Sequence, residues 1–128
     1  MTPRERYSSG APWEPIVGYS RAIKVGDRIL VAGTTAVDDE GAVVGKNAYE
    51  QAIFVFEKCI RAIEALGGTV DHIVQTRIYV VDIGNTAHDV ARAHQHCLAD
   101  TMPVSTMVGV NALVDPQLIV EVEMEAVL

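Results

Sequence analysis

The chain has 128 residues, a length that suits one domain over residues 1–128 and is too short for two independently folded units. Its 49% hydrophobic and 21% charged residues argue against a disordered or fibrous protein. A formal charge of −7 repels phosphate backbones, and the apolar runs fall far short of the roughly 20 residues that span a bilayer. We therefore expect neither nucleic acid nor a membrane as a partner.

The N-terminus and the cysteines bear on the cellular compartment. No apolar stretch follows Arg4-Glu5-Arg6, so a secretory signal is not expected. Cys59 and Cys97 lack the spacing of a redox pair or a zinc site, and both fall within helical patterns. We expect both to be packing residues in a cytoplasmic protein.

The chain begins with a segment rich in proline, serine and glycine. Residues 1–15 are therefore expected to be irregular, with Trp13 as an anchor onto the domain. Strand patterns follow over residues 17–25 and 28–32. Gly26-Asp27 separates them, which predicts a two-residue hairpin.

Two helical patterns alternate with strands in the rest of the chain. Apolar residues recur every three or four positions in each helical pattern, whereas the strand patterns alternate between two chemically distinct faces. The expected elements are a helix over 47–66, a strand over 74–81, a helix from the cap Asn85-Thr86 to about Ala99, and strands over 104–110 and 118–127.

The resulting order is β-β-α-β-α-β-β. It predicts an α+β domain with a mixed sheet and both helices packed on one face through right-handed crossovers. In the last strand Glu121, Glu123 and Glu125 share the other face, about 7 Å between successive members. These carboxylates would repel unless cations or solvent intervene, so the second face of the sheet requires an explanation.

Neither the histidines nor the acidic residues form a metal-binding pattern. His94 and His96 stand two apart on a predicted helix and project in different directions, while His72 and His88 have no spaced partner. The run Asp38-Asp39-Glu40 predicts a solvated turn, since a calcium loop needs several spaced oxygen ligands. With no phosphate-cradling or serine-elbow motif either, we expect no metal and no cofactor.

Five short motifs occur in order between Trp13 and Val127. They are Gly18-Tyr19-Ser20-Arg21-Ala22, Val31-Ala32-Gly33-Thr34, Val74-Gln75-Thr76-Arg77-Ile78-Tyr79-Val80-Val81-Asp82, Pro103-Val104-Ser105-Thr106 and Val120-Glu121-Val122-Glu123. Their order and spacing together resemble the Rid (reactive intermediate deaminase, RidA/YjgF) family. The resemblance implies a chorismate-mutase-like fold with a mixed six-stranded sheet. It also implies a homotrimer with a central barrel, outer helices and ligand clefts at the subunit interfaces.

The resemblance also implies where a site would lie. In the family's deaminases a glutamate on the last strand positions the hydrolytic water, a tyrosine lines the cleft, and an arginine two residues after a proline binds the substrate carboxylate. The glutamate falls on Glu121, the tyrosine on Tyr19 and the arginine on Ser105. The motif residues expected to bind substrate are Tyr19, Arg21, Gly33, Thr34, Ser105, Thr106 and Met107.

Ser105 departs from the family's pattern. Arginine has a planar, permanently charged guanidinium that can bind a carboxylate through two hydrogen bonds, whereas serine has one neutral hydroxyl. Arg21 shares a predicted strand face with Tyr19 and could replace the arginine, or it could pair with surface or barrel acids. Glu121 could likewise act as a general base or satisfy neighbouring donors as a structural residue.

Two functions remain open at this point. One is cofactor-independent hydrolysis of a small imine, enamine or related reactive metabolite, in which water addition to an electrophilic carbon needs only positioning. Without the arginine, ordinary 2-imino-acid deamination is not expected. The other function is a non-catalytic homotrimer that binds a small-molecule metabolite or has a regulatory role. Endoribonuclease activity, a label that some family members carry, fits the acidic charge poorly.

Overall fold

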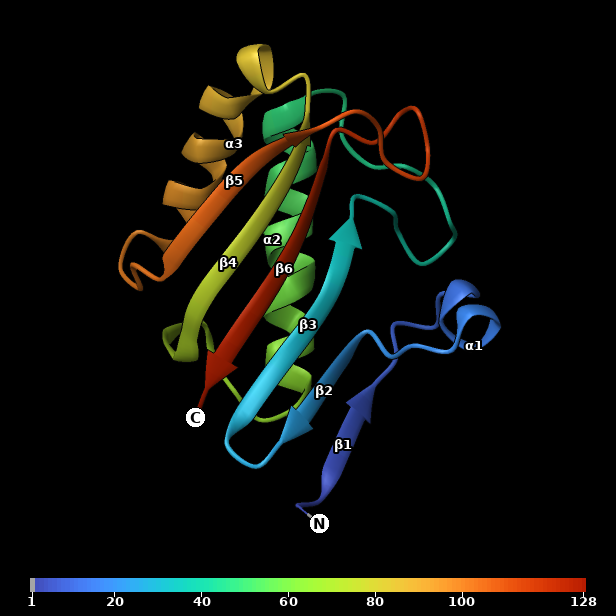
Figure 1. Ribbon diagram of the computed structural model, residues 1–128, viewed down its shortest axis with the longest axis vertical. Helices are drawn as coiled ribbons and strands as arrows, with labels where there is room; N and C mark the ends of the chain where they lie inside the picture. The colour runs from blue at the N-terminus through green and yellow to red at the C-terminus, as the bar shows by residue number, and fades with distance from the viewer. Residues whose placement is uncertain (1) are drawn as a thin grey trace.

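The structure is a computed structural model that describes residues 2–128, in which two helices cover one face of a sheet (Figure 1). The elements in chain order are β1 (Arg4–Tyr7), α1 (Trp13–Val17), β2 (Ala22–Val25), β3 (Arg28–Thr35), α2 (Ala48–Ala65), the 3-10 helix η1 (Val70–His72), β4 (Ile73–Val81), α3 (Ile83–Leu98), β5 (Val104–Val110) and β6 (Val120–Val127). Within these residues no helix has the length and apolar character needed to cross a membrane.

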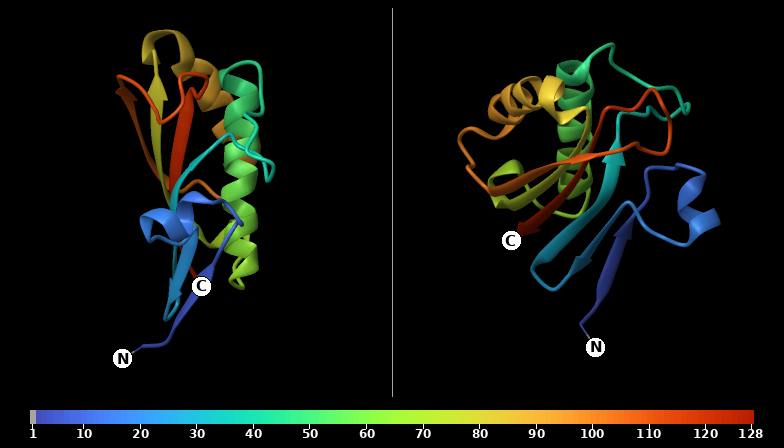
Figure 2. Two further views of the ribbon diagram at one scale, coloured as in Figure 1. Left: turned by 90° about the vertical axis from the view of Figure 1, so that its right-hand side faces the viewer. Right: turned by 45° about the horizontal axis from the view of Figure 1, so that its top comes forward.

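The six strands form one mixed sheet in the order β1-β2-β3-β6-β4-β5. β4 and β5 are parallel and joined through α3, while the other neighbouring strands are antiparallel. Figure 2 shows α2 and α3 on the same side of this sheet, with the opposite face uncovered. The predicted α+β class, the mixed sheet and the two helices on one face are thus confirmed. The order of elements predicted from the residues contains five strands, and β1 is the sixth.

The core lies between the helices and the sheet. Asn47 begins α2 by accepting a hydrogen bond on its side chain from the backbone N–H of Glu50, at 2.9 Å. Most of the predicted apolar stripe of α2 is buried against the inner face of the sheet, and Phe56, Cys59 and Ile63 are fully buried. Burying apolar side chains of this size stabilises the fold by roughly 1.5–3 kcal/mol each.

The two cysteines differ in their surroundings. Cys59 is fully buried and its thiol lies 3.9 Å from the carbonyl oxygen of Val122, so burial raises the pKa of this thiol to about 11. Cys97 is half-buried and packs at the edge of the core. Both are free thiols, as expected of packing residues.

The N-terminal predictions were wrong in detail. Residues 4–7 form β1, which pairs with β2 from Arg4 opposite Val25 to Tyr7 opposite Ala22. The expected strand over 17–25 begins only at Ala22, because Gly18, at φ 93°, ends the short helix α1 in the left-handed region. Trp13 on α1 is 59% exposed, so within the described chain it is not an anchor.

Two further boundaries differ from prediction. α3 begins at Ile83 after Asp82, so Asn85 and Thr86 lie inside its first turn instead of before it. Asn85 there donates to both carboxylate oxygens of Asp82, at 3.1 and 3.0 Å. β6 begins at Val120 instead of residue 118, because the N–H of Ile119 donates to the side chain of Gln51, at 2.8 Å, and not to a strand.

Candidate functional site

The uncovered face of the sheet carries the three glutamates of β6. Glu125 forms an ion pair with Arg28 on β3, and Glu123 accepts a hydrogen bond from the hydroxyl of Tyr79 on β4. This hydrogen bond raises the pKa of Tyr79, because the neutral hydroxyl is the donor. The expected repulsion is therefore reduced, since two of the three carboxylates have partners on neighbouring strands.

Glu121 lies beside a gap in the side-chain layer of β3. The β3–β6 ladder is interrupted between Val31 and Thr34, and Gly33 lies in this irregular stretch. A Cβ atom on Gly33 would overlap Oε2 of Glu121. The backbone of β3 and the carboxylate can approach this closely only because residue 33 has no side chain.

The surroundings of Glu121 suit a carboxylate that accepts a proton. Its side chain is half-buried, and within residues 2–128 its carboxylate has no hydrogen-bond partner. Burial raises the pKa of Glu121; the positive charge of Arg21 opposes this effect and the charge of Glu123 adds to it. A carboxylate with a raised pKa and free oxygens can hold and deprotonate a water molecule.

Arg21 joins the residues around Glu121. Its guanidinium is buried, and Nη1 donates to the carbonyl oxygen of Gly33 at 2.6 Å and to Oγ1 of Thr34 at 2.9 Å. Nη2 donates to the hydroxyl of Tyr19 at 3.1 Å. The structure therefore connects Tyr19, Gly33 and Thr34 through Arg21, and Gly33 lies beside Glu121. Arg21 holds the backbone beside the carboxylate, and whether it also binds a substrate stays a prediction.

The sequence reasoning missed the acidic partner of Arg21. Glu14 on α1 is 3% exposed and lies 3.7 Å from Nε of Arg21, and it also accepts a hydrogen bond from the hydroxyl of Ser9 at 2.6 Å. Burial acts to raise the pKa of Glu14, but the hydrogen bonds from Ser9 and Ser8 and the charge of Arg21 lower it overall. Arg21 thus pairs with a buried acid from the segment expected to be irregular, where no sequence signal singled out Glu14.

Ser105 lies on the other face of the sheet. It is opposite Thr76 in the parallel β4–β5 pair, and Oγ1 of Thr76 donates to its hydroxyl at 2.8 Å. Thr76 is fully buried toward the helices and also contacts Nε2 of His94 at 2.9 Å. Glu121 is opposite Tyr79, three residues along β4, and so projects to the uncovered face.

The side chains of the other predicted residues on β5 also alternate between the two faces of the sheet. Met107 is opposite Ile78 and packs at the core beneath the helices, whereas Thr106 is exposed opposite Arg77 on the uncovered face. In one chain, therefore, neither Ser105 nor Met107 lies beside Glu121. Residues 2–128 contain no group of three or more histidine, cysteine, aspartate or glutamate side chains that could hold a metal ion.

Comparisons with known proteins agree on one family. The family model described as endoribonuclease L-PSP matches residues 9–128. The uncharacterized protein SCO2049 of Streptomyces coelicolor is 34% identical over 121 residues, 94% of this chain and 90% of that protein. A RutC family protein of Pyrococcus abyssi is 32% identical over 122 residues, 94% of this chain and 92% of that protein.

Solved structures give the same result. Rv2704 from Mycobacterium tuberculosis, described as a member of the YjgF/YER057c/UK114 family, has a TM-score of 0.90 at 36% identity and covers 98% of this chain and 100% of its own. The YjgF gene product of E. coli has a TM-score of 0.82 at 26% identity and covers 94% of this chain and 95% of its own. The similarity therefore covers nearly the whole chain in sequence and in fold.

Proposed function

This chain belongs to the Rid (YjgF/YER057c/UK114) family, and from that membership we propose that it hydrolyses a small imine, enamine or related reactive metabolite without a cofactor. The observation that carries this proposal is the Glu121 carboxylate, which is half-buried, has a raised pKa and lies against the Gly33 backbone. Its oxygens are free to hold the water that attacks the substrate carbon.

We assign the two proton transfers of this reaction to Glu121 and Tyr19. Glu121 removes a proton from water as the oxygen attacks the imine carbon and the electron pair of the double bond moves to nitrogen. Tyr19 accepts a hydrogen bond from Arg21, which leaves its own proton available for that nitrogen. The carbinolamine nitrogen then takes the proton held by Glu121, and the hydroxyl proton passes to the Tyr19 oxygen as ammonia leaves. Imine plus water thus gives carbonyl compound plus ammonia, and both side chains regain their starting protonation.

The proposal includes a cytoplasmic homotrimer with its clefts between subunits. Its support is the uncovered face of the sheet, where Leu30 and Val108 are 38% and 42% exposed beside the glutamates of β6. A neighbouring subunit would cover these apolar side chains and complete the wall of the cleft next to Glu121. Endoribonuclease activity is not proposed, because the charge of −7 opposes binding of a polyanion.

The test is ammonia release from 2-imino acids generated in the assay and from uncharged imines. Glu121→Gln should lower the rate by about 10²–10⁴, the usual contribution of a general base. Glu125→Gln, on the same strand and face but ion-paired with Arg28, is the matched control and should keep most of the activity. If the unmodified protein accelerates release from neither substrate class, the hydrolase proposal is wrong.

A specific observation favours a second function, a trimer that binds a metabolite without turnover. The hydroxyl of Ser105, which the resemblance puts at the position of the deaminases' substrate-binding arginine, accepts a hydrogen bond from Thr76. A ligand that raises the melting temperature without being consumed would support this alternative. Measurable turnover that Glu121→Gln abolishes would exclude it.

A further inference from the structure

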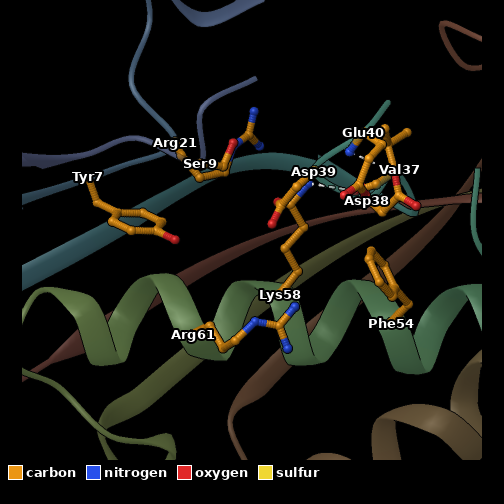
Figure 3. A pocket seen from close by; sticks show the side chains of 10 residues that line it. All are labelled: Tyr7, Ser9, Arg21, Val37, Asp38, Asp39, Glu40, Phe54, Lys58 and Arg61. Atoms are coloured by element: carbon orange, nitrogen blue, oxygen red, sulfur yellow. Dashed lines mark hydrogen bonds between the residues drawn. The ribbon is translucent and has the colours of Figure 1, made fainter. Parts of the chain in front are cut away.

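A cavity of about 230 Å³ lies between α2, the loop that follows β3 and the N-terminal segment (Figure 3). It is smaller than the roughly 300–1,000 Å³ of pockets for drug-sized ligands, so it suits a small metabolite. Its lining from α2 is on the helix-covered side of the sheet, whereas Glu121 projects to the uncovered face. Arg21 lines this cavity and also contacts the backbone beside Glu121.

One stripe of α2 forms the floor of the cavity. Phe54, Lys58 and Arg61 are spaced by four and three residues and so project from one face of the helix. Figure 3 shows Lys58 extending from α2 toward the loop that carries Asp39. The floor thus combines an apolar ring, a primary amine and a guanidinium.

The amine of Lys58 is held in place without an ion pair. Its Nζ donates to the carbonyl oxygen of Val37 at 2.8 Å, and within the described chain no acidic group lies within ion-pair distance of it. Burial lowers the pKa of Lys58, and the charge of Arg21 acts in the same direction while that of Asp39 opposes it. A desolvated lysine next to another cation has the character of an imine-forming nucleophile.

The other side chains of the cavity can assist such a nucleophile. Arg61 is exposed at the rim, and among residues 2–128 it has neither a hydrogen bond nor an ion pair. A guanidinium whose N–H groups have no other partner can bind a carboxylate through two parallel hydrogen bonds. Asp39 on the opposite wall and the Tyr7 hydroxyl are available for proton transfer. The geometry provides an amine for a carbonyl carbon and a cation for an adjacent carboxylate.

We propose that this cavity is a carbonyl-binding site in which Lys58 forms a reversible imine with a small 2-oxo acid whose carboxylate binds Arg61. The lone pair of Nζ attacks the carbonyl carbon, and the electron pair of the C=O bond moves to oxygen. Two protons pass in turn from Nζ through the Asp39 carboxylate to that oxygen, the C–O bond breaks, and water leaves as the nitrogen lone pair forms the C=N bond. One amine and one carbonyl give one imine and one water, and no oxidant or reductant is consumed.

The other lysines of the chain serve as internal controls for the test. Lys24, Lys46 and Lys58 are the lysines of the chain, and of these Lys58 lines the cavity. The full-length protein is incubated with pyruvate and cyanoborohydride, which reduces any imine to a stable adduct, and the adducts are located by peptide mass spectrometry. Lys58 should be modified more than about tenfold faster than Lys24 or Lys46, the ratio given by one charge-assisted contact to the carboxylate. Equal or slower modification of Lys58 would overturn the proposal.

Substitutions test the roles of Arg61 and Lys58 separately. Arg61→Gln should slow modification of Lys58 by pyruvate but not by propanal, which has no carboxylate, and Arg92→Gln on α3 should affect neither reaction. If Arg61→Gln slows both probes equally or neither, the assignment of Arg61 to the carboxylate is wrong. Lys58→Arg keeps a positive charge and a donor for Val37, and should remove the adduct while leaving the melting temperature within a few degrees.

This proposal is independent of the hydrolase proposal. Glu121→Gln should leave the modification rate of Lys58 unchanged while it removes ammonia release. Loss of both in that variant, with the fold intact by circular dichroism, would contradict the claim that the cavity and the Glu121 site are separate.

Discussion

Gly33 lies where the β3–β6 ladder is interrupted, and the Glu121 carboxylate occupies the space that a side chain there would fill. Gly33→Ala should therefore move the carboxylate, which is the mobile end of a flexible side chain, without disrupting the strand. We expect ammonia release to fall by about tenfold or more, as for displacement of a general base. The free energy of unfolding should change by less than about 1 kcal/mol. Steady-state kinetics and a urea titration measure these two quantities.

Gly84→Ala provides the control for this substitution. A Cβ atom at Gly84 meets nothing within 4 Å, and the residue lies within α3. Alanine there should stabilise the protein by about 0.5–1 kcal/mol and leave the activity unchanged. An active Gly33→Ala variant would show that the close approach to Glu121 has no functional role.

Ser105 allows the opposite kind of test, a gain of function. The resemblance puts the carboxylate-binding arginine of the family's deaminases at residue 105, so Ser105→Arg would supply a guanidinium to the proposed cleft between subunits. With 2-imino acids kcat/KM should rise by more than about tenfold, which corresponds to one hydrogen bond between charged groups at 1.5–3 kcal/mol. Rates with uncharged imines should stay the same. An equal rise with both classes would show that the arginine acts by a route other than carboxylate binding.

Between elements, the hydrogen-bonded row from His94 on α3 through Thr76 on β4 to Ser105 on β5 links the helix layer to the sheet edge. The His94 ring also packs edge-on against Phe56 of α2, with centroids 5.4 Å apart. Burial lowers the pKa of His94, since the charged imidazolium is disfavoured between these elements. One histidine thus connects two helices and two strands in its neutral form.

This burial predicts a pH dependence of stability. Because the folded chain holds His94 below its ordinary pKa of 6.5, the unfolded chain binds more protons in mild acid. The stabilisation should be complete above about pH 6.5 and be lost as the pH falls through the lowered pKa. The slope is at most about 1.4 kcal/mol per pH unit, and solvent screening of a half-buried ring reduces it. Urea titrations between pH 5 and pH 8 measure it.

Comparison with a neighbouring histidine isolates this effect. His94→Gln should remove most of the slope between pH 5 and pH 7, whereas His96→Gln, at an exposed position on the same helix, should leave it unchanged. The same slope in both variants would assign the pH dependence to other groups.

The elements that the sequence predicts well are those with strong periodicity. The stripe of α2 and the alternation of β4 and β6 specify both the element and its buried face. β1 was missed because its stabilising partner, β2, lies beyond α1 and the loop that follows it. Likewise, Glu121, Tyr19 and Gly33 could be grouped from sequence, but the face on which Ser105 projects depends on the parallel register with Thr76, which no local pattern encodes.

At the scale of the whole molecule, the uncovered sheet face predicts association. Val108→Asp places a charge on β5 opposite Tyr79, on the face that a neighbouring subunit would cover. The unmodified protein should sediment at about three times the chain mass of 13.8 kDa, and the variant should dissociate because burying an unpaired charge costs several kcal/mol. Analytical ultracentrifugation measures both masses.

A charge on the helix side tests whether this effect is specific. Ala91→Asp, at an exposed position of α3, should leave the mass unchanged. A monomeric unmodified protein would remove the support for interface clefts, because the open side of the Glu121 site would then face solvent.

Because the two thiols are buried unequally, their labelling rates report two different opening motions of the molecule. Cys97 is half-buried and can react with a thiol reagent during small local motions, whereas Cys59, fully buried with a pKa near 11, can react only when α2 leaves the sheet. The ratio of the two labelling rates therefore reports how often the whole core opens relative to its edge. Measured while ligands or subunits are added, the ratio of the two labelling rates would show how each affects opening of the core, without a fluorescent label or an engineered site.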